Sequence, residues 1–145
     1  MKKAYPVFIK DDSDFTLIYS PDFNKMTQAE KGNMYEVMEM ARDLICSECL
    51  ILEDNKKDLP NPSSYENAIK LVVANIDKPS FQFSDGLFQY IDIDTLEYRK
   101  KYDNHIVRKN VSIPSWLNSL ALEKGVNFSQ VLQDALKEKI NEVWK

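Results

Sequence analysis

The sequence has no long apolar run, very little glycine and few cysteines and histidines. Its apolar residues never form an unbroken stretch of roughly 18, so no membrane-spanning helix is predicted. With only three glycines, it has no glycine-rich phosphate loop. Two cysteines and one histidine are too few for a four-ligand zinc site within one chain. We therefore expect no metal, no cofactor and no membrane partner.

The N-terminus does not resemble a secretion signal. MKKAYPVFIKDD has two lysines, but its apolar stretch is broken and is followed by acids. The expected location is therefore cytoplasmic. An apolar content of 43% over 145 residues predicts a packed core, in one medium domain or two small ones.

Cys46 and Cys49 form a C-x-x-C motif inside the strongly helical segment 34–52. A redox pair would sit at a helix start, where the dipole lowers a thiol pKa. We interpret both cysteines as small apolar helix residues, with a metal site between two chains left as an alternative. His105, alone in a polar segment, is assigned no chemistry.

Charge is unevenly distributed along the chain. Residues 1–102 carry 13 basic and 18 acidic side chains, a net charge of −5, whereas residues 103–145 carry six and five, a net charge of +1. The basic bias is strongest over 99–109, where Asp103 is the only acid. The basic residues of that stretch are Arg99, Lys100, Lys101, Arg108 and Lys109. This pattern indicates two partners of opposite charge, although scattered solvated charge would also explain the acids.

The last quarter of the chain predicts one short strand followed by two amphipathic helices. Val111 and Ile113 alternate with Arg108, Asn110 and Ser112, which is typical of a strand with one apolar and one polar face.

Residues that start or end helices then define the bounds of the two helices. Pro114 ends the strand and starts a helix, and Gly125 is suited to a left-handed cap that ends it. Either Asn127 or Ser129 caps a longer helix, whose apolar positions are 128, 131, 132, 135, 136, 140, 143 and 144.

About 40 residues with one unpaired strand are too few for an independent core. A second copy would solve this, with the two strands pairing antiparallel and the helices interlocking. The predicted dimer core consists of Val111, Ile113, Trp116, Leu117, Leu120, Phe128, Val131, Leu132 and Leu136. The alternative is a helical hairpin that docks on the rest of the protein.

This order of strand, proline, helix, glycine and capped helix resembles the ribbon-helix-helix family of DNA-binding dimers. The resemblance implies that the paired strands enter the major groove of a palindromic operator. Arg108, Asn110 and Ser112 would then contact base edges and Lys109 a phosphate. Backbone amides near Asn127, Phe128 and Ser129 would hold another phosphate.

The N-terminal part predicts a small α+β domain. Strands are expected at 4–10, 15–19, 26–28 and 87–93, and helices at 34–52 and 65–75. We expect a sheet with one covered face. Residues 95–106 are charged and polar and are predicted to be a tether.

Four features stand out in this part: AYPVFIKDDSDFTLIYSPDF, Thr27-Gln28, a helix with Glu36 and Ala41, and the Leu-Pro-x-Pro-Ser motif at 59–63. Together they resemble the antitoxin HicB. The resemblance implies a partial ribonuclease-H-like domain over 1–102 and a ribbon-helix-helix domain over 103–145. Asp14 stands where the family usually has glycine, and residues 66–100 match least.

The HicB resemblance implies an inhibitor and repressor rather than an enzyme. Such a protein neutralises a HicA-like mRNA-cleaving toxin by covering its active site, and binds its own operator as a homodimer or a higher hetero-oligomer with toxin. Carboxylates suit a partner built to hold RNA. The candidate toxin contacts are Asp11, Asp12, Asp14, Asp22 and Phe23. The alternative role of these acids is to solvate a turn.

Two other functions remain open from the sequence. A ribbon-helix-helix repressor could carry a small-molecule-sensing N-terminal domain, which predicts an apolar pocket. A metal-dependent nuclease would need several acids converging on one end of the sheet. Asp11, Asp12 and Asp14 lie within one turn instead, and no distant strand contributes an obvious fourth acid.

Overall fold

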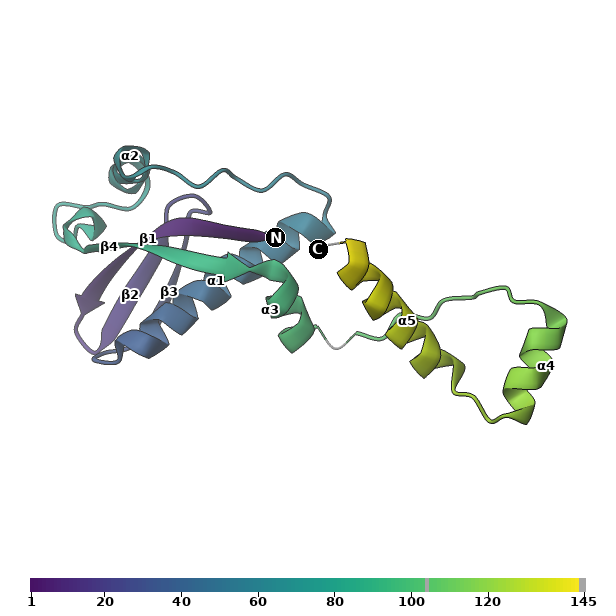
Figure 1. Ribbon diagram of the computed structural model, residues 1–145. Coiled ribbons are helices and arrows are strands. Elements are labelled where there is room, and N and C mark those ends of the chain that lie inside the picture. Colours follow the sequence, from purple (N-terminus) through teal and green to yellow (C-terminus); the bar gives the residue numbers. More distant parts are fainter. Residues whose placement is uncertain (104, 144–145) are drawn as a thin grey trace. The chain divides into compact units, whose positions relative to one another are not determined.

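The computed structural model describes residues 1–103 and 105–143 (Figure 1). The chain forms two compact units, Met1–His105 and Ile106–Lys145. Trp144, which the sequence pattern places on the apolar side of the last helix, lies outside the described residues. Across the described residues, every helix is too short or too polar to cross a lipid bilayer.

The first unit is built on a four-stranded antiparallel sheet. Its strands are β1 (Lys2–Asp12), β2 (Phe15–Ser20), β3 (Lys25–Glu30) and β4 (Leu87–Asp94), in the order β3-β2-β1-β4. All four predicted strands are confirmed, each somewhat longer than its sequence pattern indicated. The predicted α+β class is likewise confirmed.

Side-chain caps set where the helices of this unit begin. The Asn33 side chain accepts a hydrogen bond from the Glu36 amide and starts α1 (Met34–Asp54). The Ser64 hydroxyl accepts one from the Asn67 amide and starts α2 (Tyr65–Asn75). Both helices lie where the sequence predicted them. A short 3-10 turn, η1 (Phe83–Asp85), precedes β4.

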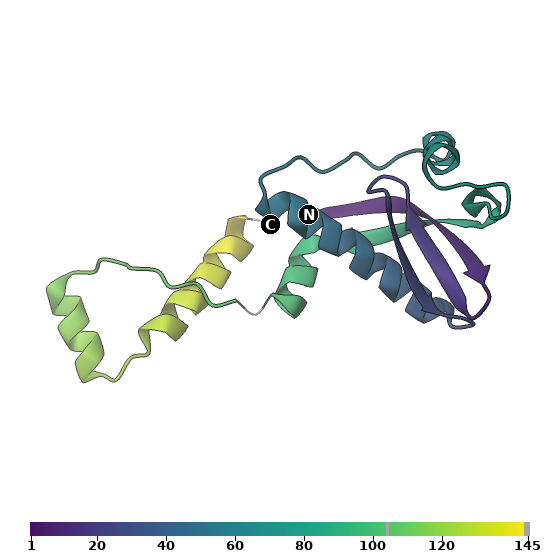
Figure 2. The same ribbon diagram turned by 180° about the vertical axis from the view of Figure 1, so that it is seen from behind.

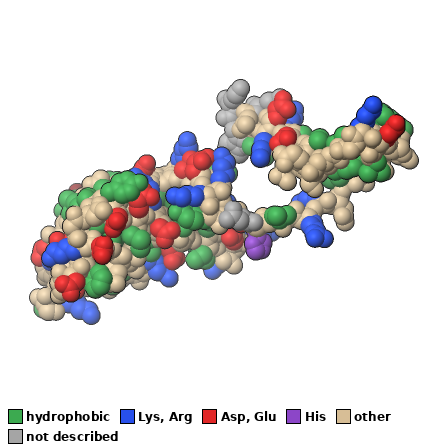
Figure 3. Space-filling view, turned by 90° about the horizontal axis from the view of Figure 1, so that it is seen from below, with side chains coloured by type: hydrophobic (Ala, Val, Ile, Leu, Met, Phe, Trp, Pro, Cys, Tyr) green, Lys and Arg blue, Asp and Glu red, His purple; other side chains and the backbone are tan. Residues whose placement is uncertain are grey.

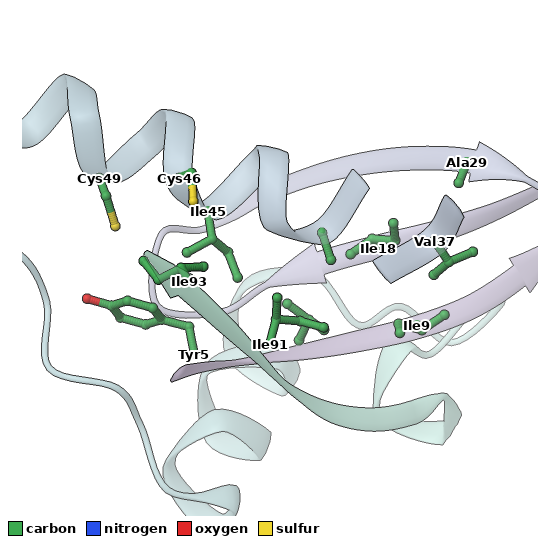
Figure 4. Packing of buried hydrophobic residues seen from close by; sticks show 12 residues of the cluster. Tyr5, Ile9, Ile18, Ala29, Val37, Ile45, Cys46, Cys49, Ile91 and Ile93 are labelled. Carbon is green, nitrogen blue, oxygen red and sulfur yellow. The ribbon is translucent and has the colours of Figure 1, made fainter. Parts of the chain in front are cut away.

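Helices cover both faces of the sheet, so the prediction of one covered face is wrong (Figures 1 and 2). One face packs against α1, with Cys46 and Cys49 directed at Tyr5 and the neighbouring strand residues (Figure 4). On the other face, α2 and η1 pack against Phe8 and Tyr19. Because β1 is enclosed from both sides, all of its residues from 5 to 9 are buried.

Residues 95–102 form a helix rather than the predicted tether. Helix α3 (Thr95–Tyr102) begins at Asp94, whose side chain accepts hydrogen bonds from two following amides. The Tyr98 hydroxyl donates to Asp43 of α1, and Arg99 pairs with Glu53 and Asp54 at 3.0 and 2.8 Å. These contacts dock α3 on α1, because its charged side chains find specific partners there.

The second unit contains α4 (Ser115–Glu123) and α5 (Phe128–Val143). The strand predicted from the alternation over 108–113 carries no regular secondary structure. A strand needs a hydrogen-bonded neighbour, and the described part of this unit supplies none.

Candidate functional site

The turn between α4 and α5 is fixed by two local caps. Gly125 has φ +66, and its amide donates to the Leu122 carbonyl, while the Val126 amide donates to the Ala121 carbonyl. This is the Schellman pattern that ends a helix. The Asn127 side chain accepts from the Gln130 amide at 3.1 Å, so Asn127, rather than Ser129, caps α5.

The caps hold α4 and α5 so that they form an apolar groove of about 610 Å³. Its lining residues are Lys109, Val111, Ile113, Leu117, Leu120, Ala121, Lys124, Val126, Phe128, Ser129, Val131, Leu132 and Ala135. Most of the predicted dimer core lies in this lining. Ala121, Val126 and Ala135 were not in the predicted dimer core, although the helical period places Ala121 and Ala135 on the apolar sides of their helices.

The second unit has almost no interior of its own. Of its residues whose burial is described, 106–141, only Ala121 and Leu132 are even half-buried. Val111 is 64% exposed, Trp116 68% and Val131 54%, and hydrophobic side chains of this unit lie at the surface (Figure 3). Contiguous exposed apolar surface of this kind marks an interaction site.

The segment before α4 presents its side chains alternately. Lys109, Val111 and Ile113 line the groove, and the intervening Arg108, Asn110 and Ser112 are exposed. Lys109 thus shares the side of the two apolar residues. The segment therefore has an apolar face, which a second copy could cover, and a polar face left for another partner.

The start of α5 also offers backbone donors. The Val131 amide bonds to the Asn127 carbonyl, and the Gln130 amide to the Asn127 side chain. Across the hydrogen bonds described for this turn, the amides of Phe128 and Ser129 have no protein acceptor. Free amides at a helix start favour an anion.

Two of the basic side chains at 99–109 form ion pairs, so less positive charge is left for a partner than the sequence suggests. Arg99 is neutralised by Glu53 and Asp54, and Lys100 pairs with Glu97 at 2.6 Å. Both are held within the first unit. Arg108 and Lys109 are the basic residues of this stretch that lie beside the groove.

The proposed toxin contacts fall into two structural groups. Asp11, Asp12 and Asp14 are exposed at the β1–β2 turn, where Asp11 accepts a hydrogen bond from the Thr16 hydroxyl at 2.6 Å. The other two, Asp22 and Phe23, are half-buried in the β2–β3 turn.

Asp22 and Phe23 both hold the first unit together. The Asp22 carboxylate accepts hydrogen bonds from the Ser63 amide and hydroxyl, which anchors the proline-rich segment after α1. The Phe23 ring packs on Tyr5 with a centroid distance of 4.9 Å. The Asp22-Ser63 contact joins two motifs of the HicB resemblance, a pairing that no local sequence signal indicates.

The cysteines are buried and free. Burial raises the pKa of the Cys46 thiol to about 11 and that of Cys49 to about 12. His105 is exposed, and the described residues contain no cluster of His, Cys, Asp and Glu side chains that could hold a metal ion. Both sulfurs therefore contribute to packing, as the sequence predicted.

Comparisons with known proteins give a structural match but no sequence match. No family model and no curated protein matches the chain. A chain of a toxin-antitoxin complex from Streptococcus pneumoniae has a TM-score of 0.58 and 24% identity, covering 96% of this chain and 99% of that one. The antitoxin HicB of Burkholderia pseudomallei gives a TM-score of 0.45 and 20% identity, covering 96% and 97%. The chain therefore shares its fold with a component of the streptococcal toxin-antitoxin complex.

Proposed function

We propose that this chain is a HicB-like antitoxin that also represses its own promoter. Residues 1–102 would form a partial ribonuclease-H-like domain that covers the active site of a HicA-like mRNA-cleaving toxin. Residues 103–145 would form a ribbon-helix-helix domain that dimerises and binds operator DNA. The protein acts by binding and not as an enzyme.

The uncovered groove of the second unit is the observation that carries this proposal. Val111 and Ile113 line it, yet Val111 is 64% exposed and Ile113 41%. Pairing this segment with the same segment of a second copy would bury both residues. It would also give the backbone N–H and C=O groups of the segment interstrand hydrogen bonds. A two-fold dimer follows, because the same patch on each copy covers the other.

Pairing leaves the exposed Arg108, Asn110 and Ser112 on the outer side of a two-stranded ribbon. Arginine can form a bidentate contact with guanine and asparagine with adenine, while serine contacts either base more weakly. The Phe128 and Ser129 amides would hold a backbone phosphate. A palindromic operator would match the two-fold symmetry.

The toxin-binding role is supported by the first unit. Its net charge of −5 over residues 1–102 suits a partner with a basic, RNA-holding surface. The fold likeness to a chain of the streptococcal toxin-antitoxin complex extends over 96% of this chain. Binding at the active site would exclude RNA sterically, and one toxin per antitoxin chain would build a larger hetero-oligomer.

Co-expression with the protein encoded by the adjacent reading frame tests both roles. We expect a stable complex, loss of that protein's RNA cleavage when the antitoxin is added, and protection of a palindromic stretch in the chain's own promoter. Absence of both partner binding and promoter protection would overturn the proposal.

A ribbon-helix-helix repressor with a ligand-sensing N-terminal domain is the alternative. It predicts an apolar pocket, but the hollow of about 710 Å³ between β1, β4, α1 and α3 is lined chiefly by charged side chains. A metabolite that raised the melting temperature and changed DNA affinity, in the absence of any toxin, would favour this alternative.

A further inference from the structure

The sheet face that packs against α2 is covered only in part. Because directly opposed residues of an antiparallel pair share a face, the register defines rows across it. In one row Phe8 lies opposite both Phe88 and Tyr19, and Tyr19 lies opposite Met26. Phe8 and Tyr19 are buried under α2 and η1, but Met26 at the end of this row is 52% exposed.

The next rows toward the β1–β2 turn become progressively more open. Leu17, flanked by Lys10 and Gln28, is half-buried and still touches the α2 cluster. Phe15, flanked by Asp12 and Glu30, is 45% exposed.

Lys10 marks where the cover ends. Its amine donates to the Gln82 carbonyl at 2.7 Å and lies over the Phe81 ring, so it is held toward the η1 side. Phe15 lies in the row beyond Lys10, and Met26 lies on the outer strand β3 in the row of Tyr19. Together with the half-buried Leu17 between them, they form the apolar part of an open strip on β2 and β3.

Carboxylates flank the Phe15 end of this strip. Asp12 and Glu30 stand on either side of Phe15, and Asp14 is exposed in the adjoining turn. Two cations are nearby: Lys31, whose amine donates to the Ser13 carbonyl at 3.2 Å, and Lys10 in the next row, whose amine is held by the Gln82 carbonyl. Three carboxylates against two amines leave the Phe15 end of the strip acidic overall, a combination of acid and exposed apolar surface that suits a basic partner with an apolar recess.

We propose that this open strip, defined by Phe15, Met26, Asp12 and Glu30, is the surface on which the first unit binds its basic protein partner. The inference rests on the proposed antitoxin function and names its contact surface. Phe15 and Met26 supply the desolvated centre and the carboxylates supply the charged rim. Asp22 and Phe23 lie outside the strip and act in folding.

The test uses the full chain and the purified protein of the adjacent reading frame. Phe15→Thr and Met26→Thr keep a residue type that strands favour while removing the anchors. We expect Phe15→Thr to raise Kd about 30-fold, the effect of losing a central anchor. Met34→Thr is the matched control, because Met34 is 50% exposed on α1, across the sheet. It should leave Kd within about twofold, because Met34 lies outside the proposed contact surface.

Charge is tested separately with Glu30→Lys. This variant should slow association and weaken the dependence of the association rate on salt. Asp58→Lys reverses an exposed carboxylate in the segment after α1 and is the control. If circular dichroism shows that Phe15→Thr is unfolded, the partner affinities of Met26→Thr and Glu30→Lys are compared with those of the control variants instead.

The outcomes separate this inference from the function on which it rests. Wild-type binding that survives Phe15→Thr, Met26→Thr and Glu30→Lys unchanged would overturn the strip and leave the antitoxin role standing. Altered self-association with unchanged partner affinity would reassign the strip to a contact between copies. A wild-type chain that neither binds nor inhibits the adjacent protein would overturn the antitoxin role and the inference together.

Discussion

Cys46 and Cys49 illustrate how the surroundings of a motif decide its chemistry. A C-x-x-C pair at a helix start favours the thiolate, but these two sulfurs lie well inside α1 and face the sheet (Figure 4). Burial raises the pKa of both thiols, to about 11 and about 12. At neutral pH they remain protonated and inaccessible to oxidants.

This burial predicts a loss of stability in alkali. The unfolded chain releases its thiol protons near the ordinary pKa of 9.0, whereas the folded chain keeps them to about 11 at Cys46. The stabilisation is therefore complete below about pH 9 and is lost as pH rises toward 11. Urea unfolding from pH 8 to 11 should show a shallower decline for Cys46→Ala than for wild type. Identical slopes would contradict the assignment.

Arg108 and Asn110 should determine which DNA sequence is bound. Because each side chain lies on the exposed side of its segment, its loss should remove base contacts without disturbing the groove. Arg108→Ala or Asn110→Ala should cost about 1–3 kcal/mol on the operator and relax preference at one base pair per half-site. Binding to a library of single-base operator variants would measure this. Equal losses on operator and random DNA would refute it.

Lys109 should behave differently from its two neighbours. It lies on the groove side with Val111 and Ile113, so its long side chain can reach a phosphate more readily than a base edge. Lys109→Ala should weaken all DNA sequences alike and reduce the slope of log K against log salt by about 1. A salt titration on operator and random DNA tests this, and a loss confined to the operator would argue against it.

Composition and capping give opposite indications for α3. Its charged and polar residues are typical of a tether. Yet Asp94 and Glu97 have the spacing of a helix start, and Arg99, Lys100 and Lys101 suit a last turn. The local signal for a helix was present. The sequence alone does not show where α3 docks. Its partners on α1 are Asp43, Glu53 and Asp54, which are far from it in the chain.

Gly125 should be the most sensitive point between α4 and α5. An added Cβ would meet nothing within 4 Å, so the cost of substitution comes from the positive φ alone. Gly125→Ala should destabilise the dimer by about 1–2 kcal/mol per chain, and Gly125→Asn by less. Urea unfolding at fixed protein concentration measures both. Glu123→Ala, two residues earlier at the last position of α4, is the control and should be near neutral.

Assembly should depend on the groove and leave the first unit intact. Ile113→Lys would place a charge in the proposed dimer core, a burial that costs several kcal/mol without a partner. We expect a monomer in analytical ultracentrifugation and no operator binding. The first unit should still unfold cooperatively, since it has its own core. Ser112→Lys, on the exposed side, should remain dimeric, and a dimeric Ile113→Lys variant would disprove the arrangement.

Short-range signals in the sequence were sufficient for the strands of the first unit, for α1, α2, α4 and α5, and for the alternation over 108–113. Each depends on caps, turns and periodicity within a few residues, so neighbouring side chains carry the information. Contacts between distant segments decided the rest. They cover the second face of the sheet, join Asp22 to Ser63, and require glycine at position 86, where a Cβ would lie 2.5 Å from the Ile9 carbonyl oxygen. They also leave Phe15 and Met26 uncovered, because exposure depends on where α2 ends over the sheet, and no local pattern records that.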